Sequence, residues 1–194
     1  MKILFFGDVF GSPGREALKT VLPGLKSDYQ IDAVIANVEN LAHGKGITPD
    51  TIKEVLDMGV DIMTSGNHVW EGKDVRLLLE DKRIPLVRPA NYPSVLPGRG
   101  YAVFPVRTQQ IGVLNLIGRV FMRQNTDDPF RLADKIIEEI REKTHIILVD
   151  FHAEASSEKI DKGVRAIENA NKDIKSRTLD SKKHEHTTGK KKAE

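Results

Sequence analysis

The sequence contains no cysteine, which excludes disulfide bonds and thiolate metal sites. Any bound metal must therefore be held by His, carboxylate, amide or water ligands, which suit Mn, Fe, Mg or Zn. Long apolar runs are also missing. The N-terminal stretch MKILFF has only five apolar residues before Gly7 and Asp8, too few for a signal peptide or a membrane span. These absences predict a cytoplasmic protein with no membrane partner.

The composition is otherwise that of an ordinary globular protein. The chain has 194 residues, of which 39% are hydrophobic and 30% are charged, and this fits one domain with or without a tail. Residues 161–194 hold ten Lys or Arg against six Asp or Glu, although the whole chain carries a formal charge of only +2. Because the basic excess lies in this last segment, the body is not expected to form a nucleic-acid-binding platform.

Apolar and amphipathic segments alternate along the first 80 residues. Strands are expected at 2–6, 33–36 and 61–64. Helices are expected at 15–22, after a Gly-Ser-Pro-Gly turn at 11–14, at 51–56, with its N-cap near Thr48, and at 75–80. This order predicts an α/β fold with a largely parallel sheet.

The second half of the chain shows a different pattern. Residues 101–106 and 111–117 are β-rich runs joined by a polar turn at 107–110, which predicts a hairpin. A helix is expected at 130–143 and a buried strand at 145–150. The combination indicates a mixed sheet, or two packed sheets flanked by helices. We expect one domain over 1–160, a helix over 161–180 and a basic, disordered tail over 181–194.

Polar side chains follow four of the expected strands. Because the carboxyl ends of parallel strands meet at one edge of a sheet, these side chains are expected to converge. Each one alone has an ordinary structural explanation, such as a turn, a helix cap or a solvated loop. Their joint placement is harder to explain by chance. The set is Asp8, Glu39, Asn40, Asn67, His68 and His152.

This set of residues favours a metal-dependent reaction. Two carboxylates brought together, Asp8 and Glu39, repel each other unless a cation lies between them. Two-metal hydrolases use such a site, with ions about 3.5–4 Å apart, to polarise a phosphoryl group and activate water. His68, next to Asn67 in the sequence, would then be placed to protonate the leaving oxygen.

Five sequence motifs carry a family resemblance. They are GDVFGSPGR (7–15), NVENLAHGKGIT (37–48), SGNHVWEGKD (65–74), RPANYP (88–93) and FHAEASSEK (151–159). In this order they resemble the YmdB-like bacterial metallophosphoesterases, a branch of the calcineurin-like phosphoesterase superfamily. The resemblance covers residues 1 to about 159.

The resemblance implies a four-layer α/β/β/α sandwich with a dinuclear iron or manganese site and phosphodiesterase activity on cyclic nucleotides, including 2′,3′-cyclic monophosphates. By motif, Asp8 and Asn40 would bind the first metal, Glu39 would bridge both, and Asn67 and His152 would bind the second. His68 would be the catalytic acid or stabilise the transition state. Homo-oligomers and a link to bacterial RNA turnover are also implied.

The chain departs from the family pattern after residue 159. Family members continue into a Gly-Thr-His-Thr-His motif whose two histidines each bind one metal, and this motif is absent here, so the fold is expected to be C-terminally truncated or diverged. His184 and His186 have similar spacing but follow no apolar strand, which favours a solvated tail. Three hypotheses remain: an active phosphodiesterase, an inactive homologue that acts by binding, or a metal-free nucleotide-binding regulator using residues 11–14.

Overall fold

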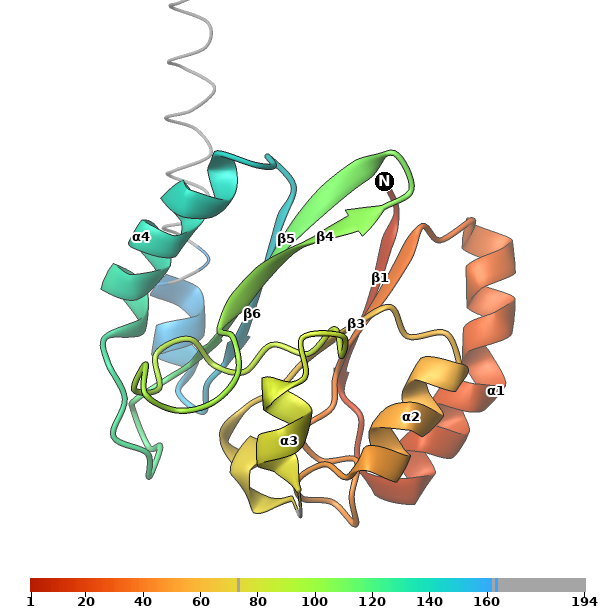
Figure 1. The fold of residues 1–194 in the computed structure, drawn as a ribbon, viewed down its shortest axis with the longest axis horizontal. Coiled ribbons are helices and arrows are strands. Elements are labelled where there is room, and N and C mark those ends of the chain that lie inside the picture. Colours follow the sequence, from red (N-terminus) through yellow and green to blue (C-terminus); the bar gives the residue numbers. More distant parts are fainter. Residues whose placement is uncertain (73, 162, 164–194) are drawn as a thin grey trace, which may run out of the picture. The chain divides into compact units, whose positions relative to one another are not determined.

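The computed structural model describes residues 1–72, 74–161 and 163. The chain forms two compact units, Met1–Glu154 and Ala155–Glu194, and all the named elements belong to the first (Figure 1). In the second unit, residues 156–161 are helical. Most of the expected helix over 161–180, the expected tail over 181–194, and both His184 and His186 lie outside the described residues.

The first half of the first unit builds a parallel sheet. Its three strands lie in the order β1-β2-β3, each parallel to its neighbour, and are joined by helical crossovers. The elements are β1 (Ile3–Asp8), α1 (Gly11–Tyr29), β2 (Ala33–Asn37), α2 (Pro49–Asp57), β3 (Ile62–Thr64), the short 3₁₀ helix η1 (Asn67–Glu71) and α3 (Val75–Glu80). The expected alternation of strands and helices is confirmed.

The second half builds a separate three-stranded sheet. Its elements are β4 (Tyr101–Val106), β5 (Gln109–Ile117), α4 (Pro129–Arg141) and β6 (Ile147–His152). β4 pairs antiparallel with β5, and β5 pairs parallel with β6. Of the two arrangements left open by the sequence, two sheets is therefore the one observed.

Three apolar clusters hold the first unit together. In the first, Leu22 of α1 and Val55 of α2 pack with Val34 of β2. In the second, Ile35 of β2 packs with Val113 of β5, so side chains from both sheets share one core. The third cluster joins β5 to α4, which lies on the other side of that sheet from β1–β3 (Figure 1). Neighbouring side chains along a strand point in opposite directions, so Val34 of β2 faces the first cluster and Ile35 faces the second. β2 is therefore buried on both faces.

Helix α1 differs from the sequence prediction at both ends. The Gly-Ser-Pro-Gly segment is not a turn before the helix but its first turn, since α1 begins at Gly11. The helix also continues through Pro23 to Tyr29, although an internal proline removes a backbone hydrogen bond. The buried side chains of Leu18 and Leu22 supply the tertiary packing that offsets this loss.

Two further boundaries shift by two residues. The hairpin turn contains only Arg107 and Thr108, because β5 begins at Gln109. β6 runs from Ile147 to His152, so His152 is the last residue of the strand and not part of a following loop. Among the described residues, no helix is both long enough and apolar enough to cross a bilayer.

Candidate functional site

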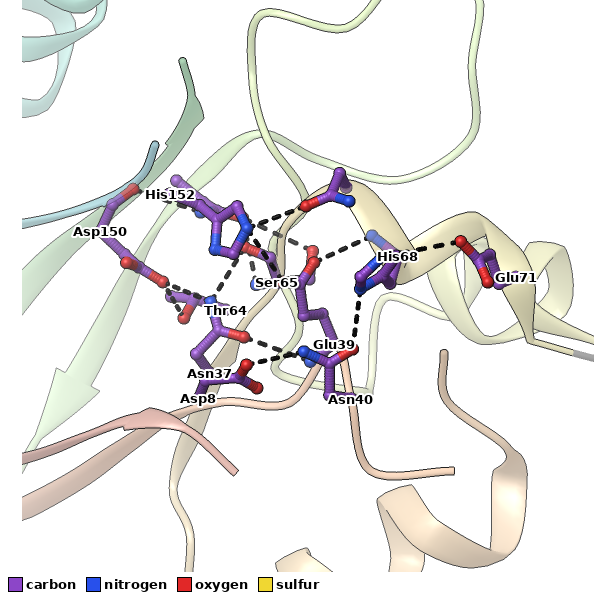
Figure 2. Close-up of polar contacts among 12 residues, drawn as sticks. Asp8, Asn37, Glu39, Asn40, Thr64, Ser65, His68, Glu71, Asp150 and His152 are labelled. Atoms are coloured by element: carbon purple, nitrogen blue, oxygen red, sulfur yellow. Dashed lines mark hydrogen bonds and ion pairs between the residues drawn. The ribbon is translucent and has the colours of Figure 1, made fainter. Parts of the chain in front are cut away.

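The predicted site residues lie where the strands of both sheets end. Asp8 ends β1, while Glu39 and Asn40 follow β2 within three residues. Asn67 and His68 open the 3₁₀ helix η1 after β3, and His152 ends β6 of the second sheet. Figure 2 shows that the side chains of five of them, all except Asn67, point toward one another and are connected by polar contacts. Asn67 joins them through a hydrogen bond to His152. The structure therefore brings together all six of them: Asp8, Glu39, Asn40, Asn67, His68 and His152.

Glu39 lies at the centre of these contacts and is fully buried. Its Oε2 accepts a hydrogen bond from the backbone N–H of His68 at 2.9 Å, whereas Oε1 has no hydrogen-bond partner among the described residues. Burial raises the pKa of Glu39 to about 7, and the negative charges of Asp8, Asp150 and Glu71 act in the same direction. A buried carboxylate with an unused oxygen and anionic neighbours is an unfavourable arrangement without a counter-charge.

Asn40 connects Asp8 to His68. Its Nδ2 donates to Asp8 Oδ2 at 2.7 Å, and its Oδ1 lies 2.8 Å from His68 Nδ1. Since the amide oxygen accepts, Nδ1 of His68 carries the hydrogen of this bond. The other ring nitrogen, Nε2, lies 3.8 Å from a carboxylate oxygen of Glu71.

His152 reaches across from the second sheet. Its Nε2 lies 2.8 Å from Asn67 Oδ1 and 3.1 Å from Glu39 Oε1. Only the first of these contacts has hydrogen-bond geometry, and the second is a close approach of the imidazole to the carboxylate. Burial lowers the pKa of His152, despite the opposing effect of Asp150, and this favours a neutral imidazole. A neutral imidazole is the form that binds metals.

Sequence reasoning missed a set of polar residues beneath the site. Asp150 Oδ2 of β6 accepts hydrogen bonds from Asn37 Nδ2 of β2, at 3.0 Å, and from the Thr64 hydroxyl of β3. Burial raises the pKa of Asp150. Asn115 of β5 accepts from the backbone N–H of Ser65 at 3.1 Å. The available signal was a polar residue within an otherwise apolar run, as in GVLNLI and ILVDF.

Gly66 allows the chain to pass directly over Glu39. A Cβ added at Gly66 would overlap Glu39 Oε2, far closer than real side chains approach. The absence of a side chain at Gly66 therefore permits the backbone to descend onto the carboxylate and to present the N–H of His68 to it.

The RPANYP motif is structural in the described part of the chain. Arg88 is buried and donates hydrogen bonds to the backbone oxygens of Pro89, Leu96 and Pro97. Asn91 bonds to both backbone groups of Ile117. The motif thus fixes the long connection between β3 and β4.

A cavity opens beside the site. Its volume is about 500 Å³, and Asn67 and His68 form part of its wall. Small-molecule sites commonly have volumes of about 300–1,000 Å³. The cavity therefore gives a small ligand access to the imidazole of His68.

Within the described residues, no group of three or more Asp, Glu, His or Cys side chains is arranged as a ready-made metal cage. The side chains that could serve as ligands are hydrogen-bonded to one another instead, as His152 is to Asn67 and Asn40 is to Asp8. Two of the candidate ligands, Asn40 and Asn67, are amides and so do not belong to these four residue types.

Comparison with known proteins supports the sequence resemblance. The family model described as YmdB-like protein matches residues 4–170. A 2′,3′-cyclic-nucleotide 2′-phosphodiesterase of Bacillus subtilis (strain 168) is 45% identical over 161 residues, which are 82% of this chain and 60% of that protein. The chain spans 57% to 60% of the length of the curated relatives that it matches.

Two solved structures share the fold. A hypothetical protein from Thermus thermophilus matches with a TM-score of 0.76 and 42% identity, covering 83% of this chain and 61% of that one. A novel phosphatase from Mycoplasma pneumoniae matches with a TM-score of 0.76 and 37% identity, covering 83% of this chain and 58% of that one. The match of the family model over most of the sequence shows that this chain belongs to the YmdB-like protein family, a relative of the calcineurin-like phosphoesterases.

Proposed function

We propose that the chain is a metal-dependent phosphodiesterase that hydrolyses nucleoside 2′,3′-cyclic phosphates at the strand ends. The observation that carries this proposal is Glu39, a buried carboxylate whose Oε1 has no hydrogen-bond partner in the described part of the chain. The B. subtilis relative, named as a 2′,3′-cyclic-nucleotide 2′-phosphodiesterase, supports the substrate class.

The residues present fit a pair of divalent ions. Burial and the nearby charges of Asp8 and Asp150 raise the pKa of Glu39, and a cation beside the unpaired Oε1 would favour the charged carboxylate. His152 adds a neutral nitrogen, and the amides add neutral oxygens. This mixture of oxygen and nitrogen donors without sulfur suits iron or manganese.

The proposed ligands follow the family pattern. Asp8 and Asn40 would hold one ion, Asn67 and His152 the other, and Glu39 would bridge them. The chemistry supplied by two bound ions is polarisation of the phosphoryl group and activation of water near neutral pH.

We also propose that the first unit has the four-layer α/β/β/α sandwich of the family, with the three apolar clusters as the interfaces between its layers. Residues 1–160 would form this domain.

His68 would act as the general acid of the reaction. Hydrolysis breaks the bond between phosphorus and O2′, and the departing oxygen must gain a proton to leave as a hydroxyl group. Nδ1 of His68 is held by Asn40, so Nε2 is the nitrogen available to deliver this proton. The Glu71 carboxylate, 3.8 Å from Nε2, offsets the positive charge of the ring while it holds two protons. The product would be a nucleoside 3′-phosphate.

A second candidate function is binding without turnover. It is favoured by the hydrogen bonds that engage His152 and Asn40 without a metal. This candidate predicts weak binding of a single metal ion and no hydrolysis.

The test is hydrolysis of 2′,3′-cyclic AMP by the full chain, with Mn²⁺ and with EDTA, followed by chromatography of the products. We expect 3′-AMP to form with Mn²⁺ and the reaction to stop with EDTA. If Mn²⁺ is demonstrably bound and no nucleotide is hydrolysed, the phosphodiesterase proposal is wrong and the binding function is favoured.

A further inference from the structure

Phe121 lies on the wall of the cavity beside His68 and is an unusual residue for its position. Its side chain is 85% exposed, the largest exposed fraction of any aromatic among the described residues. A single exposed apolar side chain is common on protein surfaces. The ring of Phe121 stands out because it lies on the wall of a cavity shared with His68, where it can contact a bound ligand.

The backbone at Phe121 is also in an uncommon conformation. Met122 N–H donates to the Arg119 carbonyl at 3.2 Å, so residues 119–122 form a turn in which Phe121 is the third residue. Its φ is +64°, a value that glycine adopts readily and that is rare for a bulky side chain. The chain thus has a phenylalanine where glycine would be less strained. Strain of this kind is found at ligand sites.

The polar residues of the cavity do not by themselves select a ligand. Lys45 and Arg123 bring positive charge, whereas Glu71 and Glu154 bring negative charge. Gln124 adds an amide that can donate to and accept from the edge of a base. The cavity therefore combines balanced charge with an exposed aromatic face, and it adjoins the imidazole proposed to act on a phosphodiester.

We propose that Phe121 is the stacking platform for the nucleobase of the substrate, so that the cavity is a nucleoside subsite and Phe121 sets the preference for nucleotides over other phosphodiesters. This inference rests on the proposed function for its setting, but it concerns binding and is testable without turnover. Aromatic rings bind bases of any sequence because every base has a π-face. The subsite would accept both purines and pyrimidines.

The test measures binding of adenosine 3′-monophosphate and of ribose 3-phosphate, which lacks the base, to the full chain by calorimetry in the presence of Mn²⁺. Wild type should bind the nucleotide more tightly than the sugar phosphate. Phe121→Ala should weaken binding of the nucleotide roughly 5- to 150-fold, the range measured for loss of one base–aromatic stack. Binding of ribose 3-phosphate should not change.

Three further variants separate stacking from folding. Phe121→Gly removes the ring at a φ that glycine tolerates, so it should weaken nucleotide binding as much as Phe121→Ala without lowering the melting temperature. Phe121→Tyr keeps an aromatic ring and should bind the nucleotide as tightly as wild type does. Tyr29→Ala removes another exposed aromatic, at the C-terminal end of α1, and should have no effect on binding.

The outcomes distinguish this inference from the proposed function. If the Phe121 variants bind the nucleotide as wild type does, or if wild type binds the two ligands equally, the stacking role is overturned even when the chain hydrolyses 2′,3′-cyclic AMP. If the chain hydrolyses no diester but nucleotide binding depends on an aromatic residue at position 121, the phosphodiesterase proposal fails and the nucleoside subsite stands.

Discussion

Nε2 of His152, at the end of β6, lies 3.1 Å from Oε1 of Glu39, which follows β2, so a residue from each sheet meets at one point. The two residues are 113 positions apart in the chain. This contact forms only when the two sheets pack against each other, which makes the site a product of the whole first unit. Substitutions that disturb the packing of the two sheets should therefore also disturb the site.

Asp150 should stabilise the packing of the two sheets. Replacing it by Ala leaves the donors of Asn37 and Thr64 without their acceptor, and each unpaired buried donor costs about 1–3 kcal/mol. We therefore expect Asp150→Ala to lower the free energy of unfolding in urea at pH 7. Thr64→Val, which removes only one of the two bonds, should have a smaller effect. Equal stability of Asp150→Ala and wild type would show that this contact is unimportant for packing.

Gly66→Ala should disturb the site without any change of a polar residue. The added Cβ must displace the Glu39 carboxylate, which occupies the space that the Cβ would take. We expect affinity for Mn²⁺, measured by calorimetry, to fall about 10- to 100-fold, as it does when residues that orient metal ligands are altered. Gly24→Ala is the matched control because a Cβ at Gly24 meets nothing within 4 Å. Unchanged Mn²⁺ binding in Gly66→Ala would contradict the assigned position of Glu39.

Glu39 should make the metal-free protein less stable as the pH rises. Its pKa is raised from 4.5 to about 7, so the folded state favours the protonated form. The stability that this form contributes is present below pH 4.5 and is lost as the pH rises through 7; the difference is about 3 kcal/mol. Glu39→Gln, measured by urea unfolding in EDTA, should therefore be more stable than wild type at about pH 8.5 and similar to it at about pH 4.5.

The same experiment has a matched control in Glu80→Gln, which removes an exposed carboxylate paired with Arg76 on helix α3 and is not among the charges that act on Glu39. This variant should follow the pH dependence of wild type. If Glu39→Gln also follows wild type at every pH, then Glu39 is not the source of the alkaline destabilisation, and the unfavourable burial described for it is wrong.

His68 should affect turnover more than binding. His68→Ala is expected to lower kcat for 2′,3′-cyclic AMP by about 10²- to 10⁴-fold, the usual contribution of a proton donor, with little change in KM or in Mn²⁺ affinity. His43→Asn is a suitable control because His43 is an exposed histidine at positive φ, which Asn tolerates. A large loss of Mn²⁺ binding in His68→Ala would instead make His68 a metal ligand.

Elements with strong local signals were predicted well from the sequence. Thr48 was expected to cap the second helix, and it forms a capping box with Thr51 at the start of α2. Helix α3 spans the expected residues 75–80. In these segments the cap residue or the apolar period determines the structure locally.

The sequence prediction was less successful where tertiary packing overrides local preference. The first helix was expected to end at residue 22, before Pro23, yet the packing of its buried side carries α1 past this proline. Asp150 was expected to end a buried strand and Asn37 to follow one, and neither was given a role, because no local pattern reveals that residues 113 positions apart share a hydrogen bond. The convergence of the six candidate residues could be predicted because each lies at or just after a strand end.

The most direct test of the proposed metal-dependent site is the number of Mn²⁺ ions bound by the metal-free chain, determined by calorimetry and elemental analysis for wild type and Glu39→Gln. We expect wild type to bind two ions per chain and Glu39→Gln to lose affinity for both, because Glu39 would bridge them. Equal Mn²⁺ binding by the two proteins, or no binding by wild type, would show that Glu39 does not hold a pair of metal ions.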